Sequence, residues 1–171
     1  NNGRMSENNL RISQLFIHPI KSCGGIAVDE APLIETGFEY DREWMVVDRD
    51  GDLVTQREVP RMALIQPKLR ASDLVLRAPG MLALHLQLDA VEGDCRVRVW
   101  DDTVDAFDMG DLAAQWFSDC LGQPVRLARF NPEVRRLASA QWTGKIEART
   151  AFADGFPLLV LSTASLAELN R

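Results

Sequence analysis

The sequence predicts a mainly β fold of the α+β class, a barrel or sandwich with one or two short helices. Short segments of β-forming residues recur at even spacing, and a period-two pattern such as Leu82-x-Leu84-x-Leu86-x-Leu88 places alternate side chains on one face. Only two segments have helical character. With 171 residues, of which 46% are hydrophobic and 26% charged, the chain has enough apolar material for a core.

The predicted strands alternate with turn residues along the whole chain. They are 12–18, 26–34, 44–49, 53–57, 62–70, 73–76, 82–87, 95–100, 103–107, 125–129 and 156–161. The first predicted helix, 112–121, has acidic residues before and in its first turn, and Gly122 then Pro124 stop it. A second helix is predicted from Ser162 onward, where Ser165 and Glu168 have the spacing of a capping box.

Composition changes divide the chain into four predicted parts. Residues 1–9 are expected to be a tag or disordered leader, and 10–130 a β-barrel domain. Residues 131–155 carry Pro, Ser, Gly and mixed charge with weak periodicity, which is typical of a linker or mobile loop. Residues 156–171 are expected to begin another domain that is truncated, because the second helix has no glycine cap or terminating proline.

The loop after the first strand has the chemistry of an anion site. His18-Pro-Ile-Lys-Ser-Cys-Gly-Gly follows an apolar run and places Lys21 and Ser22 before two glycines. Gly24 and Gly25 allow sharp or left-handed turns, which would bring backbone N–H groups beside the ammonium. The alternative is a plain turn between strands with a solvated lysine, because Lys-Ser-x-Gly is much shorter than a full phosphate-loop motif.

A β-hairpin is predicted farther along, with Trp44–Val47 and Leu53–Thr55 as its arms and Asp50-Gly51 in the turn. Antiparallel pairing returns Arg42 and Arg57 to the same end of this hairpin. Both arginines are also ordinary at strand ends, where neighbouring carboxylates can pair with them.

The segment 156–165 predicts a second anion site. An apolar run of buried-strand type, Phe156–Leu161, leads directly into the second helix. Such a junction exposes unpaired N–H groups that can bind a phosphate or a carbonyl. The alternative is a serine that caps the helix and binds nothing.

Charge and cysteine content limit the function classes. A net charge of −6 and a pI near 4.9 argue against nonspecific binding to nucleic acid or anionic membranes. No apolar run is long enough to span a bilayer, and the first residues lack the basic-then-apolar profile expected of a secretory signal. Three cysteines without a disulfide framework favour a reducing, cytoplasmic location.

No metal ligand is predicted in this chain. The cysteines lack Cys-x-x-Cys spacing, and His18 and His85 are isolated. Cys95 lies in a strand-like alternation, and Cys120 lies on the apolar side of the first helix. Cys23 is the one alternative, because it adjoins Lys21 and Ser22.

Four blocks of sequence resemble the N-terminal β-barrel that precedes a MOSC domain, as in the mitochondrial amidoxime-reducing component and its bacterial homologues. The resemblance covers nearly everything from Leu10 to Arg171. The blocks occur in the family's order: His-Pro-Ile-Lys-Ser-Cys at 18–23, Asp-Arg-Glu-Trp at 41–44, Val-Thr-Gln-Arg-Glu-Val-Pro-Arg at 54–61, and Phe-Pro-Leu-Leu-Val-Leu-Ser-Thr-Ala-Ser-Leu-Ala-Glu-Leu-Asn at 156–170.

The resemblance implies a site for the molybdenum cofactor, Mo-molybdopterin. The family's phosphate- and pterin-binding residues fall here on Lys21, Ser22, Arg42, Ser162, Thr163, Ala164 and Ser165. Relatives bind the metal through a cysteine in the MOSC domain, about a hundred residues farther on, so this fragment alone is expected to be inactive. Lysine, an arginine fork and neutral donors suit a phosphomonoester, because charge-assisted hydrogen bonds are about twice as strong as neutral ones.

The family also implies a reaction and partners for the full-length protein. These are reduction of an N-hydroxylated or N-oxygenated small molecule, electrons from a donor protein or reductase, and in some relatives a 2Fe–2S domain. Pyridoxal phosphate binding is a further family expectation. A non-catalytic cofactor or sulfur carrier is the first alternative, and a plain interaction barrel with surface Lys21 and Arg42 is the second.

Basic residues are expected to gather near the proposed pocket in this acidic chain. They are Lys21, Arg42, Arg57 and Arg61. The doublet Arg135-Arg136 is expected in a solvated loop, with an interdomain contact as the alternative.

Overall fold

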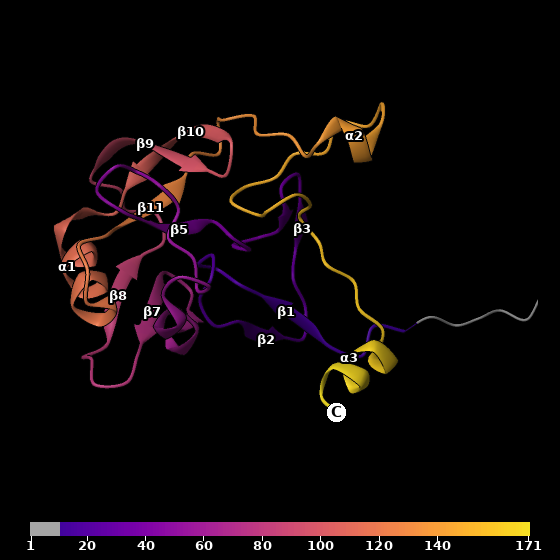
Figure 1. Cartoon of the computed structure of the whole chain (residues 1–171), viewed down its shortest axis with the longest axis horizontal. Helices are drawn as coiled ribbons and strands as arrows, with labels where there is room; N and C mark the ends of the chain where they lie inside the picture. The colour runs from indigo at the N-terminus through magenta and orange to yellow at the C-terminus, as the bar shows by residue number, and fades with distance from the viewer. Residues whose placement is uncertain (1–10) are drawn as a thin grey trace, which may run out of the picture.

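The computed structural model describes residues 11–171, so the leader predicted at 1–9 lies outside the described residues (Figure 1). Short strands dominate, as the mainly β prediction requires. The elements are β1 Leu15–Ile17, β2 Ile26–Val28, β3 Leu33–Ile34, β4 Gly37–Phe38, β5 Trp44–Val47, η1 Pro60–Leu64, β6 Gln66–Leu69, β7 Asp73–Arg77, β8 Leu84–Gln87, β9 Gly93–Val99, β10 Asp102–Asp108, α1 Gly110–Leu121, β11 Arg126–Phe130, α2 Ala140–Thr143 and α3 Thr163–Leu169.

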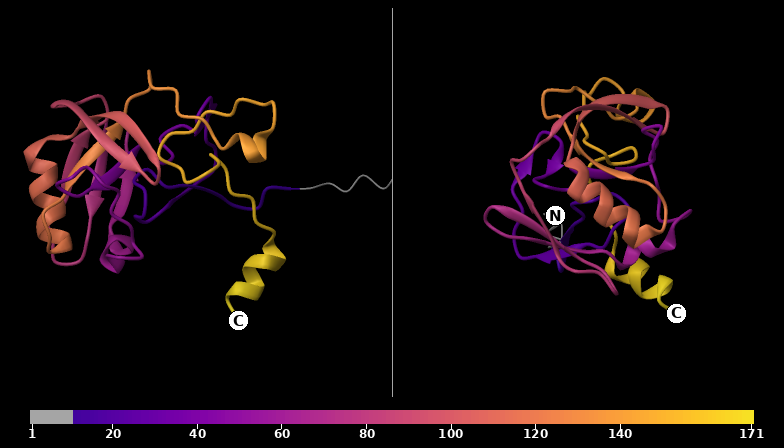
Figure 2. Two further views of the ribbon diagram at one scale, coloured as in Figure 1. Left: turned by 45° about the horizontal axis from the view of Figure 1, so that its top comes forward. Right: turned by 90° about the vertical axis from the view of Figure 1, so that its left-hand side faces the viewer.

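The strands form four antiparallel sheets. The largest has the order β5-β11-β10-β9, the next is β6-β7-β8, and β1-β2 and β3-β4 are two-stranded. An isolated bridge between Ile20 and Trp44 joins the loop after β1 to β5. Bridges of Val47 with Leu53 and of Asp52 with Arg98 place the segment 52–53 between β5 and β9. Within residues 11–171 the named strands do not form one continuous closed sheet. The predicted barrel or sandwich is a mainly β body in which the curved sheets stay separate (Figure 2).

Strand β5 lies between two hydrophobic clusters. Trp44 and Val46 point into the cluster that β7, β8 and α1 complete, whereas Met45 and Val47 point into a cluster with Phe130 and β9–β10. Successive strand residues point to opposite faces, and all four of these residues are buried. A four-residue run without a polar position therefore marks the centre of the molecule.

Helix α1 confirms the predicted helix over 112–121 and begins two residues earlier. Its buried face includes Trp116, Phe117 and Cys120. The helix ends where Gly122 adopts a left-handed φ of 74° and its N–H donates to the carbonyl of Ser118. Its packing against β11 covers one side of the larger cluster.

Three predicted strands have different structures. The segment 26–34 splits into β2 and β3, because the Asp29–Pro32 stretch interrupts it. The segment 62–70 begins as the 3₁₀ helix η1, which Pro60 starts, before β6 follows. The segment 53–57 is only a hairpin arm, joined to β5 by a bridge between Val47 and Leu53.

The predicted buried strand 156–161 is wrong. This segment is extended but joins no sheet among the described residues, and Leu159 is 79% and Val160 88% exposed. Apolar composition alone cannot supply a neighbouring strand, which burial requires. The segment leads into α3, which stands apart from the two larger sheets (Figures 1 and 2).

The helix after this segment is confirmed, but its cap is three residues earlier than predicted. The Ser162 hydroxyl accepts the N–H of Ser165 at 3.0 Å, so Ser162 is the N-cap and Ser165 occupies the third helical position. The predicted capping box of Ser165 with Glu168 is therefore wrong.

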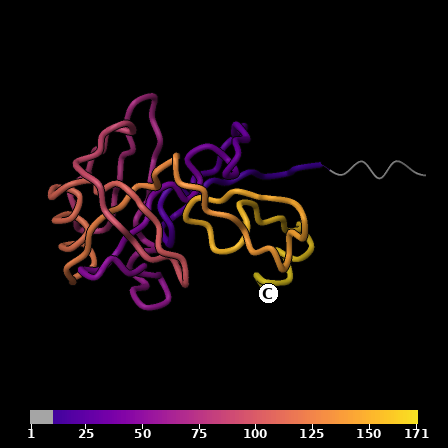
Figure 3. The backbone as a smooth tube through the Cα atoms, turned by 90° about the horizontal axis from the view of Figure 1, so that it is seen from above, coloured from indigo at the N-terminus to yellow at the C-terminus, as the bar shows by residue number. Residues whose placement is uncertain are grey.

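The predicted linker contains structure of its own. It includes α2 and lies to one side of the two larger sheets (Figure 3). Its last part, 150–153, is buried, and the Phe152 ring packs edge-on against Phe130 with ring centroids 5.3 Å apart. The domain boundaries at 130 and 155 stay predictions, but Ala151 and Phe152 belong to the smaller hydrophobic cluster.

Candidate functional site

Backbone pairing places Lys21 beside Arg42. The loop after β1 runs parallel to residues 42–44: the N–H of Arg42 donates to the carbonyl of His18 at 2.8 Å, and the N–H of Lys21 donates to that of Trp44 at 2.8 Å. Two segments about twenty residues apart in the chain thus carry their basic side chains to one place. The predicted convergence of Lys21 and Arg42 depends on this pairing.

The two glycines of the loop are needed for space. A Cβ on Gly24 would lie 2.9 Å from the carbonyl oxygen of Ile65, and one on Gly25 would lie 2.6 Å from the His18 ring. The left-handed conformation expected of a glycine occurs instead at Ser22, whose φ is 67°. The predicted role of the glycines is therefore corrected from turning to close packing.

Three residues in the left-handed region line one cavity. These are Ser22, Arg42 with φ 52°, and Trp100 with φ 55°. Non-glycine residues with such φ values are uncommon, and strained backbone of this kind costs about 1 to 3 kcal/mol per residue. The cavity has a volume of about 590 Å³, within the usual range for small-molecule sites. Concentration of strain in its wall marks it as the candidate functional site.

Lys21 lies in this wall with only 6% of its surface exposed. Its Nζ donates to the carbonyl oxygen of Phe152 at 2.8 Å and to Oδ1 of Asp154 at 2.5 Å. Burial lowers the pKa of Lys21, and the hydrogen bond from its ammonium to Asp154 opposes that shift. A buried ammonium needs such partners, and both come from residues that sequence reasoning assigned to a linker.

Arg42 is oriented by its neighbour Asp41. The buried Asp41 carboxylate forms an ion pair with the Arg42 guanidinium and accepts the backbone N–H of His18 at 2.6 Å. The His18 ring lines the same cavity, where burial first and the Arg42 charge second lower its pKa. The imidazole is therefore neutral at neutral pH and adds no positive charge to that of Lys21 and Arg42.

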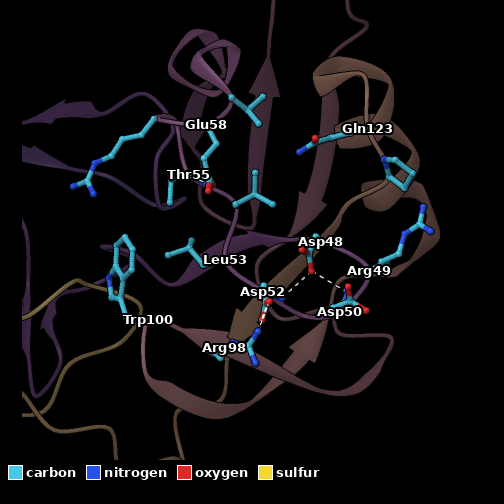
Figure 4. Close-up of a pocket in the computed structure, with 14 residues that line it drawn as sticks. Asp48, Arg49, Asp50, Asp52, Leu53, Thr55, Glu58, Arg98, Trp100 and Gln123 are labelled. Atoms are coloured by element: carbon cyan, nitrogen blue, oxygen red, sulfur yellow. Dashed lines mark hydrogen bonds and ion pairs between the residues drawn. The ribbon is translucent and has the colours of Figure 1, made fainter.

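Trp100 lies between this cavity and a second one, named here the acidic cavity after Asp48, Asp50, Asp52 and Glu58, which line it together with Arg49, Arg57 and Arg98. Its indole Nε1 donates to Oδ1 of Asp154 at 2.8 Å, and the Arg57 guanidinium lies over the ring, 5.8 Å from its centroid. Thr55, Arg57 and Trp100 line both cavities. Figure 4 shows Thr55 and Trp100 in the second cavity. Trp100 and Asp101 form the two-residue turn between β9 and β10, where a tryptophan gives no sequence signal of the left-handed φ it adopts.

Arg136 is buried, which corrects the expected solvated doublet. Its guanidinium donates to the carbonyl oxygens of Ala151 and Ala153, both at 2.7 Å, and pairs with Asp102 at 2.8 Å. Arg135 is exposed and pairs with Glu147. Arg136 thereby fixes the backbone that carries Phe152 and Asp154, a contact with no local sequence signature.

Ser162 and Thr163 line a neighbouring cavity of about 330 Å³. It shares His18, Arg42 and the segment 157–159 with the Lys21 cavity, so Arg42 borders both spaces. Ala164 and Ser165 line neither of these two. The structure brings Lys21, Ser22 and Arg42 together and places Ser162 and Thr163 next to them; cofactor binding by all seven residues stays a prediction.

Two other expectations change. Arg61 does not line the Lys21 cavity, because its guanidinium donates to the carbonyl of Pro79 at the exposed surface. Burial raises the pKa of the Cys23 thiol far above its usual value, so it is not a thiolate at neutral pH. Among residues 11–171, no group of three or more His, Cys, Asp or Glu side chains is arranged to hold a metal ion.

Comparison with known families identifies the fold. The family model for the MOSC N-terminal beta barrel domain matches residues 9–124. The chain belongs to this family. The MOSC N-terminal match ends before β11, so the Lys21 and Arg42 wall lies inside it, whereas Asp154 and Ser162 lie beyond.

Curated relatives extend the similarity to nearly the whole chain. Mitochondrial amidoxime reducing component 2 of Bos taurus is 37% identical over 93% of this chain and 50% of its own length. Molybdenum cofactor sulfurase of Homo sapiens is 31% identical over 94% of this chain and 19% of its own length. A solved structure from Bordetella bronchiseptica is 33% identical, covering 62% of this chain and 92% of that one, with a TM-score of 0.48. The chain spans about half the length of the amidoxime-reducing relatives.

No helix within the described residues is both long and apolar enough to cross a membrane. The cytoplasmic location stays a prediction, and several relatives are named as mitochondrial proteins.

Proposed function

We propose that the Lys21 cavity binds the phosphate end of a molybdenum cofactor, in a protein that reduces N-oxygenated compounds when complete. The convergence of Lys21, Ser22 and Arg42 in one cavity of a chain with net charge −6 carries the proposal. The names of the relatives support the cofactor, because they include amidoxime-reducing components and molybdenum cofactor sulfurases.

The residues of the cavity fit such a group. An ammonium, a guanidinium and a hydroxyl from Lys21, Arg42 and Ser22 are the donors that a phosphomonoester requires. Arg57 adds a second guanidinium at the Trp100 side. The volume of about 590 Å³ accommodates a phosphate with part of a bicyclic ring system.

Each side chain has a separate task in this proposal. The Lys21 ammonium supplies a point charge, and the planar Arg42 guanidinium fixes the orientation of the phosphate through paired N–H donors. Ser162 and Thr163, in the neighbouring cavity, would contact the part of the ligand that extends past Arg42. When bound, the molybdenum centre supplies the oxygen-removing redox chemistry, and this chain holds and orients it.

Partners follow from the same proposal. An N-hydroxylated or N-oxygenated small molecule is the substrate, and a separate donor protein or reductase supplies the electrons. A 2Fe–2S domain and pyridoxal phosphate binding stay family expectations, because no contact among the described residues bears on either.

A carrier of the cofactor or of its sulfur is the second candidate function. The observation that favours it is the match to molybdenum cofactor sulfurases over 94% of this chain. The reductase and the carrier require the same phosphate site, and they differ in whether the protein reduces an N-oxygenated compound.

The test uses the full-length protein with its natural flanking sequence. Metal analysis measures bound molybdenum, and fluorescence of the oxidised pterin measures bound cofactor. Lys21→Ala with Arg42→Ala is expected to lower pterin content at least 100-fold, because two charge-assisted hydrogen-bond donors of about 1.5–3 kcal/mol each are lost. Arg61→Ala is the matched control, because it removes a cation outside the cavity.

The outcomes separate the candidates. Pterin retained in the double variant contradicts the site. Bound molybdenum with reduction of an N-hydroxylated amidine supports the reductase, and bound molybdenum without that reduction supports the carrier.

A further inference from the structure

The Lys21 ammonium already has an anion beside it, and that anion belongs to the protein. Oδ1 of Asp154 lies 2.5 Å from Nζ, at the place where the proposed phosphate would bind. The Lys21 side chain is 7% exposed, whereas that of Asp154 is 65% exposed. The cation is fixed in the wall, and its partner is at the surface.

The Asp154 side chain can move away from Lys21 without a change in the backbone of the cavity wall. Its carboxylate is held by Lys21 and by the Trp100 indole through the same oxygen, Oδ1. The backbone around it is fixed separately by Arg136, through the carbonyls of Ala151 and Ala153. Rotation of one short side chain therefore moves the carboxylate into solvent while the backbone stays in place.

Asp154 is ionised when it occupies this position. Burial opposes its ionisation, but the hydrogen bonds from Lys21 and Trp100 outweigh burial and hold the pKa of the carboxyl below its ordinary value. An external ligand at Lys21 must therefore compete with a full negative charge.

We propose that Asp154 is a displaceable counter-anion that makes the Lys21 cavity selective for dianions. This inference rests on the proposed phosphate site. A monoanion offers Lys21 no more charge than Asp154, which is tethered and present at high effective concentration. A phosphomonoester near neutral pH carries nearly two charges and three acceptor oxygens, so it can replace the carboxylate and still engage Arg42.

Displacement also releases Trp100. Its Nε1 loses the Asp154 acceptor when the carboxylate leaves, while Arg57 remains over the ring. The Trp100 indole N–H therefore reports the position of Asp154 independently of ligand affinity.

The experiment titrates inorganic phosphate and acetate into the full-length protein purified without cofactor. Calorimetry measures affinity, and the indole N–H resonance of Trp100 measures release of Asp154. Asp154→Asn is expected to bind phosphate about 10-fold more tightly, equal to about 1.4 kcal/mol, and to gain acetate binding. Asp154→Glu is expected to restore the preference for phosphate over acetate.

The matched control is Asp50→Asn. Asp50 lies in the acidic cavity, and its replacement changes the net charge by the same amount without touching Lys21. It is expected to change phosphate affinity less than 2-fold. Trp100→Phe removes one donor to Asp154, so it is expected to increase phosphate affinity by a smaller factor than Asp154→Asn.

The results distinguish failure of this inference from failure of the site. If Asp154→Asn binds phosphate no more tightly than the unsubstituted protein, the proposal that Asp154 is a counter-anion is overturned. An equal increase in phosphate affinity in Asp50→Asn overturns it as well. Lys21→Met is expected to abolish phosphate binding in either background; phosphate affinity that is unaffected by Lys21→Met overturns the proposed site itself.

Discussion

Two adjoining cavities of this protein differ in the contacts that satisfy their charged side chains. In the acidic cavity, Oδ1 of Asp48 accepts the N–H groups of Asp50 and Asp52 at 2.9 Å each, and Asp52 pairs with Arg98 (Figure 4). The hydrogen bonds of Asp48 are local and close the hairpin turn after β5.

In the Lys21 cavity, Arg42 also pairs with a neighbour, Asp41, but Lys21 has partners that are distant in sequence. The Lys21–Asp154 pair is separated by 133 positions and depends on the tertiary structure. Of the residues with a left-handed φ, Ser22 and Arg42 line this cavity and not the acidic one, and Trp100 lines both. Asp48 therefore stabilises a local turn, whereas Lys21 depends on a segment far along the chain, and the proposed exchange of Asp154 for a phosphate acts on that contact.

Removal of the Phe152 side chain tests the Lys21 cavity most severely. The ring is fully buried beside Phe130, and the backbone of Phe152 contacts both Lys21 and Arg42. Phe152→Ala is expected to lower the free energy of unfolding by about 4 kcal/mol and to abolish phosphate binding. Urea denaturation with calorimetry measures both, and normal phosphate binding would contradict the role of this segment as the wall.

Arg136 tests whether the wall depends on its guanidinium. Arg136→Met leaves the buried carbonyls of Ala151 and Ala153 without donors, so a loss of about 3 kcal/mol in unfolding free energy is expected. Arg135→Ala is the control, because its exposed ion pair is worth less than about 1 kcal/mol. Equal losses in the two variants would show that Arg136 does not hold the segment.

Substitution of Asp48 tests whether its hydrogen bonds in the acidic cavity stabilise the fold. Asp48→Ala removes the acceptor of two backbone N–H groups and is expected to cost about 1 kcal/mol, whereas Asp50→Ala should cost much less. Phosphate binding at Lys21 should remain unchanged in both variants. A large loss of phosphate binding in Asp48→Ala would show that the two cavities are not independent.

Titration of His18 is expected to have the smallest effect on stability, and its pKa also reports whether an anion is bound nearby. Because burial and Arg42 lower its pKa in the folded protein, the unfolded state binds more protons between that lowered value and the ordinary one near 6.5. Stability is therefore expected to fall as pH decreases through this window, which urea midpoints measure. Bound phosphate should raise the pKa of His18 in an NMR titration, and an unchanged value would place the anion elsewhere.

Periodic patterns predicted the strands and the helix well. Strands β9 and β10 and helix α1 bury alternate or one-sided residues, and such patterns are visible without neighbours. The family resemblance placed Lys21, Ser22 and Arg42 at one site, and the structure brings them into one cavity, whereas binding by them stays a prediction. The apolar run 156–161 was misjudged because burial of a strand depends on what lies beside it, which its own composition does not contain.

The missed site residues share one property. Asp154, Trp100 and Arg136 act through contacts that join distant parts of the chain. An aspartate before Gly155, a tryptophan in a two-residue turn and one arginine of a doublet have no distinctive local sequence. Their contacts form only when the segment after β11 packs against the loop that carries Lys21 and the turn that carries Trp100.

The exposed run from Leu158 to Leu161 also affects how this polypeptide behaves in solution. Four consecutive apolar, uncharged residues, extended and exposed in the structure, provide a template onto which another molecule can add a strand. The nearest charged side chains in sequence are Asp154 and Glu168, too far away to act as gatekeepers against such addition. Residues 1–171 on their own are therefore expected to self-associate as concentration rises, and a charged residue at Val160 would suppress this.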